Sequence, residues 1–202
     1  MKQIFILFII CFTPNFFLAQ EFDGTIFLKD GSYKIGKIHI PRRADSKVIV
    51  FDGNEIAGEQ VSLVNININN IPYRFIYSNY AHYKYNKYKE SKKYYWFLKM
   101  DYIEGDRLEY YVTSTKFKIS KKGDLVVEAI GDPPMIMHVI KKKDEKILIL
   151  ANEEYYATFS IGKNIVLKRM IEGYLSDCEK LKNIKTKDLS LEDTINTYNN
   201  CD

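Results

Sequence analysis

The chain has 202 residues and a formal net charge of +4 at pH 7, from 30 Lys and Arg against 26 Asp and Glu. This surplus is too small to indicate nucleic acid or an anionic membrane surface as a partner. The composition therefore excludes the strongly basic classes of binding protein, and we expect no nucleic-acid partner.

The first twenty residues have the features of a secretory signal peptide. Lys2 supplies a positive start, the run from Ile4 to Phe12 is apolar, and Ala19 precedes the polar Gln20. These features are typical of export signals, and the apolar run is too short to span a bilayer comfortably. We expect residues 1–20 to be removed and the mature chain to act in the periplasm, at the cell surface or in the medium.

Two alternatives to cleavage are lipidation of Cys11 and retention of the leader as an N-terminal anchor. Lipidation requires a small residue before the cysteine, whereas Ile9 and Ile10 precede Cys11. No stop-transfer segment follows the leader, so we expect no transmembrane segment in the mature chain. The remaining length, about 180 residues, is enough for one domain with a sizeable core.

The cysteines fit an exported protein. Cys11 belongs to the leader, which leaves Cys178 and Cys201 in the mature chain. Two remaining cysteines pair by default in an oxidising compartment. We therefore predict a Cys178–Cys201 disulfide that tethers the C-terminal segment and contributes about 3 kcal/mol in the chain-entropy model.

Strand patterns fill the chain from Thr25 to about Phe159. Asp30-Gly31 lies between two β-prone runs and predicts a hairpin. Gly36, inside the second run, predicts a bulge or a close backbone approach. The alternation from Val64 to Asn69 is typical of a half-buried strand. Further strands are expected at 47–51, 73–77, 94–102, 107–119, 125–130, 135–140 and 147–150.

Helical spacing is found only near the C-terminus. One helix face is predicted to carry Leu167, Met170, Ile171, Tyr174, Leu175, Cys178 and Leu181. Ser190 is expected to cap a second helix, with Asp193 three residues into it. We predict that residues 21–202 form a single domain, mainly β with a helical C-terminal segment from about residue 163. The expected architecture is an antiparallel β-sandwich or an open barrel.

Several short motifs resemble a loose group of exported, β-rich proteins of unknown function from Gram-negative bacteria. The motifs are Gly24-Thr25-Ile26, Asp30-Gly31, Gly36-Lys37-Ile38, Lys47-Val48-Ile49-Val50-Phe51 and Tyr198-Asn199-Asn200-Cys201. Mature chains of this group begin with a DG hairpin and finish in a short helix near Tyr-Asn-x-Cys. The resemblance implies an envelope-associated β-rich protein and no particular activity.

The densest candidate for a binding site is the segment from Tyr80 to Trp96, where tyrosines alternate with lysines. Such a surface can stack on sugar rings or hold a peptide, with Lys over the aromatic faces. The candidate ligand-binding residues are Tyr83, Tyr85, Tyr88 and Trp96. The alternative interpretation is a solvated loop with a strand edge.

Motifs for catalysis and metal binding are weak. His39, His82 and His138 have no partner at a metal-ligand spacing. The acidic cluster from Asp101 to Glu109 does not match a calcium loop and is typical of a solvated turn. We expect no catalytic residue, no metal and no cofactor.

The sequence predicts an exported, non-enzymatic envelope or secreted protein. It would bind another macromolecule, such as an envelope protein or a polysaccharide, or support the cell surface. The alternative is a carrier for a glycan or a small apolar ligand, using the interior or mouth of the β structure. A hydrolytic enzyme is the third candidate, because paired carboxylates can come from distant segments.

Overall fold

The computed structural model describes residues 21–84, 87–101, 107–129, 135–155, 163–184 and 190–201, so the expected signal peptide lies outside the described residues. The strands are β1 (Glu21–Leu28), β2 (Tyr33–His39), β3 (Val48–Phe51), β4 (Asn54–Ala57), β5 (Val61–Ile68), β6 (Ile71–Ser78), β7 (Tyr80–Lys84), β8 (Lys87–Glu90), β9 (Tyr95–Lys99), β10 (Leu108–Thr113), β11 (Lys116–Ile119), β12 (Leu125–Glu128), β13 (Met135–Lys142) and β14 (Leu148–Tyr155). The helices are α1 (Lys163–Glu172), α2 (Glu179–Lys182) and α3 (Leu191–Asn199), with a 3-10 turn at Gly58–Gln60.

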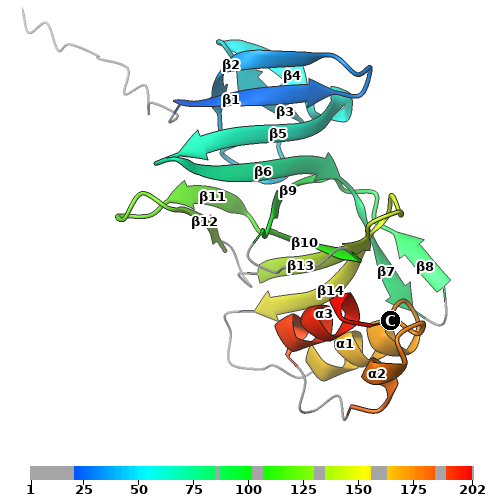
Figure 1. Ribbon diagram of the computed structural model, residues 1–202. Coiled ribbons are helices and arrows are strands. Elements are labelled where there is room, and N and C mark those ends of the chain that lie inside the picture. The colour runs from blue at the N-terminus through cyan, green and yellow to red at the C-terminus, as the bar shows by residue number, and fades with distance from the viewer. Residues whose placement is uncertain are drawn as a thin grey trace, which may run out of the picture.

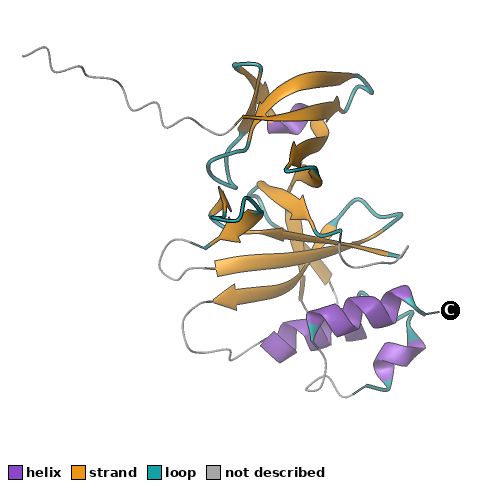
Figure 2. Ribbon diagram, turned by 60° about the vertical axis from the view of Figure 1, so that its left-hand side comes forward, coloured by secondary structure: helices purple, strands orange, loops and turns teal. Residues whose placement is uncertain are grey.

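Twelve strands form one sheet in the order β4-β3-β2-β1-β5-β6-β9-β10-β13-β14-β7-β8, and β11 and β12 form a separate hairpin (Figure 1). Neighbouring strands in the described part of the chain pair antiparallel, except β14 with β7, which are parallel. The helices lie beside β14 on the C-terminal side of the sheet (Figure 2). The predicted class, mainly β with C-terminal helices, is confirmed.

The β1–β2 hairpin has the predicted turn. Gly31 has a φ of 89°, which glycine adopts without steric cost. The Asp30 carboxylate accepts hydrogen bonds from the backbone and the hydroxyl of Ser32. Gly36 pairs in register with Gly24, so it forms no bulge. A Cβ atom at Gly36 would instead overlap the Asp52 carboxylate, so the glycine leaves room for that side chain.

The C-terminal half of the sheet curls, because β6 and β7 are nearly continuous, with only Asn79 between them. β6 pairs with β9, whereas β7 pairs with β14 on the far side of β10 and β13. The strands between them therefore bend into an open barrel. Its interior cluster contains Tyr80, Phe97, Tyr111, Met137, Val139, Leu148 and Leu150.

The alternate side chains on these strands face away from the barrel interior, and the helices cover many of them. Tyr110, Ile140, Ile149 and Ala151 pack in one cluster with the helical residues. The seven helical residues predicted to share a buried face are all buried. A larger core lies between the N-terminal strands and the β11–β12 hairpin, where Phe75 meets Phe117 edge to face.

The prediction of one continuous helix from Leu167 to Leu181 is wrong, because the segment is divided into two helices. α1 ends at Glu172, turns follow from Gly173 to Asp177, and α2 begins at Glu179. Gly173 is a poor helix former. Asp177 accepts hydrogen bonds from Lys142 of β13 and Tyr198 of α3, and these bonds hold the chain in the turn. In the described part of the chain no helix is long and apolar enough to cross a membrane.

The predicted strand from 107 to 119 is also divided. β10 ends at Thr113 and β11 begins at Lys116 in a different sheet. The hydroxyl of Thr113 donates to the carbonyl of Trp96, and that of Ser114 donates to the carbonyl of Met135. These side-chain bonds replace ladder bonds and redirect the chain.

Two local predictions near the C-terminus are confirmed. Ser190 and Asp193 form a capping box at the start of α3, each side chain binding the backbone N–H of the other. Cys178 and Cys201 are joined by a disulfide across a sequence separation of 23.

Candidate functional site

The aromatic residues proposed from the sequence do not form one surface. Trp96 has no solvent exposure, contacts the ring of Tyr77, and donates from Nε1 to the carbonyl of Ser46 at 2.9 Å. The structure therefore places Trp96 in the core and not on a binding surface. Trp96 is buried because the face of β9 on which it lies packs against the N-terminal core.

Tyr83 and Tyr88 lie on the β7–β8 hairpin. Tyr88 is 48% exposed, and its ring meets Tyr174 edge to face. Tyr83 pairs with Tyr88 in the ladder. Tyr85 lies outside the described residues. The expectation that these tyrosines bind a ligand stays a prediction.

A small pocket opens beside the interior of the open barrel. Its volume is about 200 Å³, and it is lined by Arg43, Asp45, Tyr95, Ser114, Thr115, Met135 and Met137. Arg43 and Asp45 form a two-bonded ion pair, with both N–O distances at 2.8 Å. The two methionines lie on one face of β13, and such flexible side chains adapt to apolar ligands.

The barrel interior also contains a charged cluster. Glu109 binds Lys99 at 2.9 Å and Lys141 at 2.5 Å, and it accepts a hydrogen bond from the hydroxyl of Tyr111. Burial alone would raise the pKa of Glu109, but the bonds from Lys141 and Lys99 outweigh it and lower the pKa to about 2. Burial and the Glu109 carboxylate raise the pKa of Tyr111. Glu109 is thus an ionised, fully bonded group and a poor general acid.

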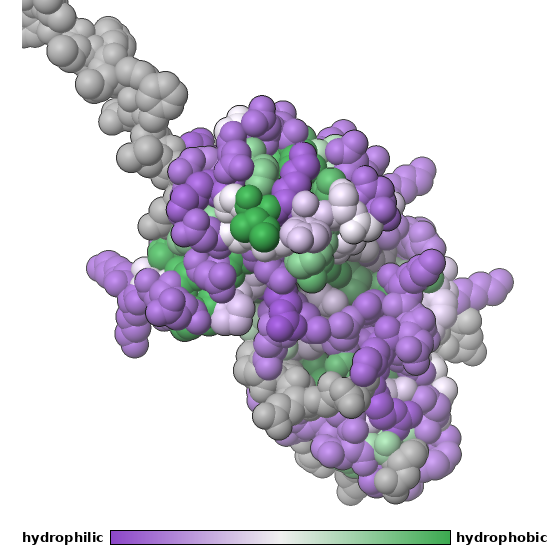
Figure 3. Space-filling view, turned by 45° about the horizontal axis from the view of Figure 1, so that its top comes forward, coloured by the Kyte–Doolittle hydropathy of each residue, from purple (hydrophilic) through white to green (hydrophobic). Residues whose placement is uncertain are grey.

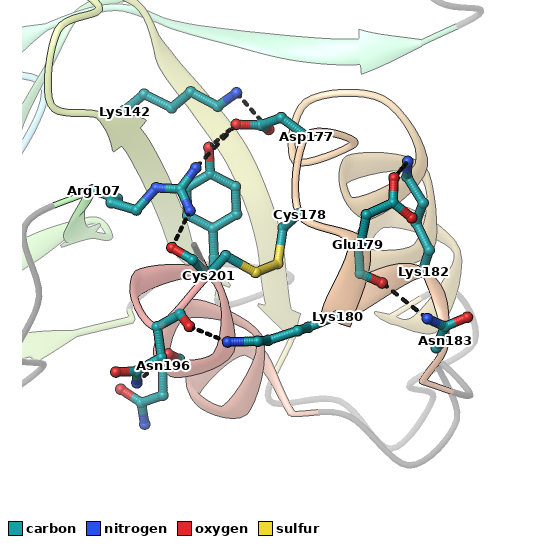
Figure 4. Close-up of a disulfide and its surroundings, with 12 residues drawn as sticks. Arg107, Lys142, Asp177, Cys178, Glu179, Lys180, Lys182, Asn183, Asn196 and Cys201 are labelled. Atoms are coloured by element: carbon teal, nitrogen blue, oxygen red, sulfur yellow. Dashed lines mark hydrogen bonds and ion pairs between the residues drawn. A yellow bond between two sulfur atoms is a disulfide. The ribbon is translucent and has the colours of Figure 1, made fainter.

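A second charged network surrounds the disulfide (Figure 4). Asp177 accepts from the hydroxyl of Tyr198 at 2.6 Å and from Nζ of Lys142 at 2.9 Å. Arg107 lies over the Tyr198 ring, 4.5 Å from its centroid, and donates to the carbonyl of Cys201 at 2.6 Å. Burial opposes ionisation of Asp177, but the bonds from Tyr198 and Lys142 keep its pKa below the usual value. This network fastens α3 and the disulfide to the sheet.

Among the described residues of the N-terminal half, the most exposed apolar side chains lie on one face of the β1–β2 hairpin. Ile35 is 73% exposed and Tyr33 is 63% exposed. Tyr33 lies opposite Phe27, with 6.1 Å between the ring centroids, and Ile35 lies opposite Thr25. Leu63 of β5 lies beside Phe27. We call these five residues the β1–β2 face.

The β1–β2 face is continuous with a row of polar pairs. Asp23 and Lys37 lie opposite each other, with 2.7 Å between Oδ1 and Nζ, followed by Glu21 and His39 at 2.9 Å. The space-filling view shows hydrophobic groups surrounded by hydrophilic ones over the N-terminal strands (Figure 3). An exposed apolar patch with a polar rim is typical of a protein-interaction site. The sequence shows this signal only weakly, since Tyr33 and Ile35 alternate with lysine and glycine as in an ordinary half-buried strand.

Comparison with known proteins gives no relatives. No protein-family model matches the chain, no curated protein matches it, and no solved structure matches it. The resemblance to the exported β-rich group therefore stays a prediction. Within the described ranges, no group of three or more His, Cys, Asp or Glu side chains is arranged to hold a metal ion.

Proposed function

We propose that the protein is an exported, non-enzymatic component of the cell envelope or extracellular space and binds another macromolecule through the β1–β2 face. The observation that carries this proposal is the exposure of Ile35 and Tyr33 side by side on one face of the sheet. Leaving large apolar groups in water costs free energy that a partner recovers when it covers them. The expected leader, residues 1–20, and the Cys178–Cys201 disulfide support an extracytoplasmic location.

The carrier alternative has less support. Ligand sites for small molecules usually enclose about 300–1,000 Å³. The pocket beside the barrel has about 200 Å³, and the interior behind it is filled by side chains such as Phe97 and Val139, neither of which has any solvent exposure. The enzyme alternative has less support still. Among the described carboxylates, Glu109 has the pKa that departs most from the usual value, and two lysines neutralise it.

Site-specific photo-crosslinking in the native host tests the proposal. A photo-activatable phenylalanine analogue placed at Tyr33 is expected to give a discrete adduct with one macromolecule, and Ile35→Asp in the same chain is expected to abolish it. The matched control is the same analogue at Tyr94, which is 41% exposed but stacks on Tyr77 elsewhere on the molecule. Equal labelling from positions 33 and 94, or no adduct from position 33, would overturn the proposal.

A further inference from the structure

Among the described strands, none covers the outer edge of the first half of β2. β3 pairs with β2 only where Phe51 and Val50 lie opposite Ile38 and His39. Before that point, within the described residues, no strand pairs with β2 on the side away from β1. The free edge therefore runs from Tyr33 to Gly36.

Hydrogen-bonding groups on this edge point outward at alternate residues. The N–H of Lys37 donates to Oδ1 of Asp52 at 2.7 Å, and its carbonyl accepts from the N–H of Asp52 at 2.8 Å. Both groups of Lys37 thus point away from β1. In an antiparallel ladder the direction alternates along the strand, so the groups of Ile35 and Tyr33 point outward as well. The carbonyl of Ser32 accepts from Leu28 of β1, which agrees with this alternation.

We propose that the Tyr33–Gly36 edge takes up an extended segment of a partner protein as an additional β-strand. This inference rests on the proposed function and specifies how its binding surface works. The backbone groups of Tyr33 and Ile35 would bond the added strand, and their exposed side chains would pack beside it on the β1–β2 face. The bonds of Asp52 to Lys37 end the free edge, so they fix where the added strand must stop.

A second copy of the chain fits this edge poorly. Suppose that two copies pair through this edge about a two-fold axis. More than one pair of residues can then exchange hydrogen bonds only if Tyr33 of each copy lies opposite Ile35 of the other. That register places Lys34 directly opposite the same lysine, and like charges in this position are destabilising. In a second register, Ile35 lies opposite Ile35 of the other copy. Tyr33 of one copy then lies opposite Lys37 of the other, whose backbone groups are already bound by Asp52.

The same geometry defines the chemistry of the partner segment. Lys34 is exposed and forms no ion pair among the described residues, so an acidic residue fits opposite it. The residues on either side of that position point to the β1–β2 face, where Tyr33 and Ile35 favour apolar neighbours. The partner segment is therefore extended and alternates apolar, acidic and apolar residues.

The test uses the peptide Ser-Thr-Val-Glu-Val-Thr-Ser as the probe and the same peptide with Lys in place of Glu as its control. Binding of the Glu peptide to the mature protein is expected to slow amide hydrogen exchange at Tyr33 and Ile35, measured by NMR. The Lys peptide is expected to bind more weakly, and Lys34→Glu is expected to reverse this preference. Unchanged exchange at both amides under excess Glu peptide, or no effect of Lys34→Glu on the preference, would overturn the inference.

Two variants at one position separate the backbone bond from the side-chain contact. Ile35→Ala and Ile35→Pro both remove the exposed side chain, but only proline also removes the outward N–H, which β1 does not use. The proline variant is expected to bind the Glu peptide about tenfold more weakly than the alanine variant. Equal binding by two folded variants would overturn strand addition. A persistent crosslink from Tyr33 in that case would leave the proposed function intact, whereas loss of that crosslink would reject both.

Discussion

Asp52 completes the hydrogen bonding of Lys37 at the edge of β2. Its carboxylate accepts from the N–H of Lys37 at 2.7 Å, and its own N–H donates to the Lys37 carbonyl at 2.8 Å. Asp52 has a φ of 45°, so it lies in the left-handed region that Asp and Asn tolerate better than most residues. One turn residue thereby ends the free edge.

Asp52→Ala is expected to lower the free energy of unfolding by about 1–2 kcal/mol, because the Lys37 N–H loses its acceptor and the left-handed backbone loses a tolerant residue. Asp52→Asn keeps an oxygen acceptor and a residue that tolerates the left-handed backbone. It therefore serves as the control, with a smaller expected loss of unfolding free energy. Urea unfolding measures both variants. Equal stability of the alanine variant and the native protein would contradict this account of the edge.

Glu109 makes stability depend on pH in the acid range. Its pKa is about 2 in the folded protein against 4.5 as the ordinary value, so its contribution is fully present above pH 4.5. That contribution is lost as the pH falls from about 4.5 toward 2. Glu109→Gln is therefore expected to flatten this part of the stability profile, measured by thermal unfolding between pH 2 and 6.

The matched control for Glu109 is Glu55→Gln, at an exposed position of β4 that has no ion pair within the described residues. It is expected to leave the acid part of the profile unchanged. A Glu109→Gln profile that is parallel to that of the native protein would show that the two lysines do not hold this carboxylate.

The disulfide tethers the end of α3 to the start of α2, where Cys178 is the N-cap. Replacing both Cys178 and Cys201 by serine is expected to lower the free energy of unfolding by about 3 kcal/mol, since the unfolded chain regains the freedom of the closed loop. Chemical unfolding of the oxidised protein and the double variant measures the difference. Full labelling of both thiols in the native exported protein, under denaturing and non-reducing conditions, would contradict the bond.

Trp96 is the one tryptophan of the chain, so its fluorescence reports on the N-terminal core. Because its ring is fully buried, emission from the folded protein is expected to be blue-shifted and little quenched by iodide. Trp96→Phe is expected to cost about 1–3 kcal/mol, since the carbonyl of Ser46 loses its donor. Strong iodide quenching in the folded protein would place Trp96 on the surface after all.

Removal of the expected leader, residues 1–20, can be measured directly. Mass spectrometry of the protein exported by its native host is expected to give a mature start near Gln20, because Ala19 supplies the small residue before the cut. The non-reduced mass is expected to be two hydrogens below the reduced mass. An intact N-terminus on the exported protein would favour the retained anchor.

Features set by neighbouring residues were predictable from the sequence. The Asp30-Gly31 turn follows from the freedom of glycine at positive φ, and the cap at Ser190 follows from a side chain that binds N–H groups two or three residues away. The Cys178–Cys201 pairing was predictable because only two cysteines lie beyond the expected leader.

Features set by distant strands were not predictable in this way. Trp96 and Tyr88 both lie in the aromatic segment, yet one is buried by the N-terminal core and the other stays half exposed. The free edge at Tyr33 and Ile35 exists because β3 reaches β2 only at Ile38. Local pattern determines turns, caps and strand faces, whereas long-range pairing decides which strands meet, which faces are covered and which edge is left unpaired.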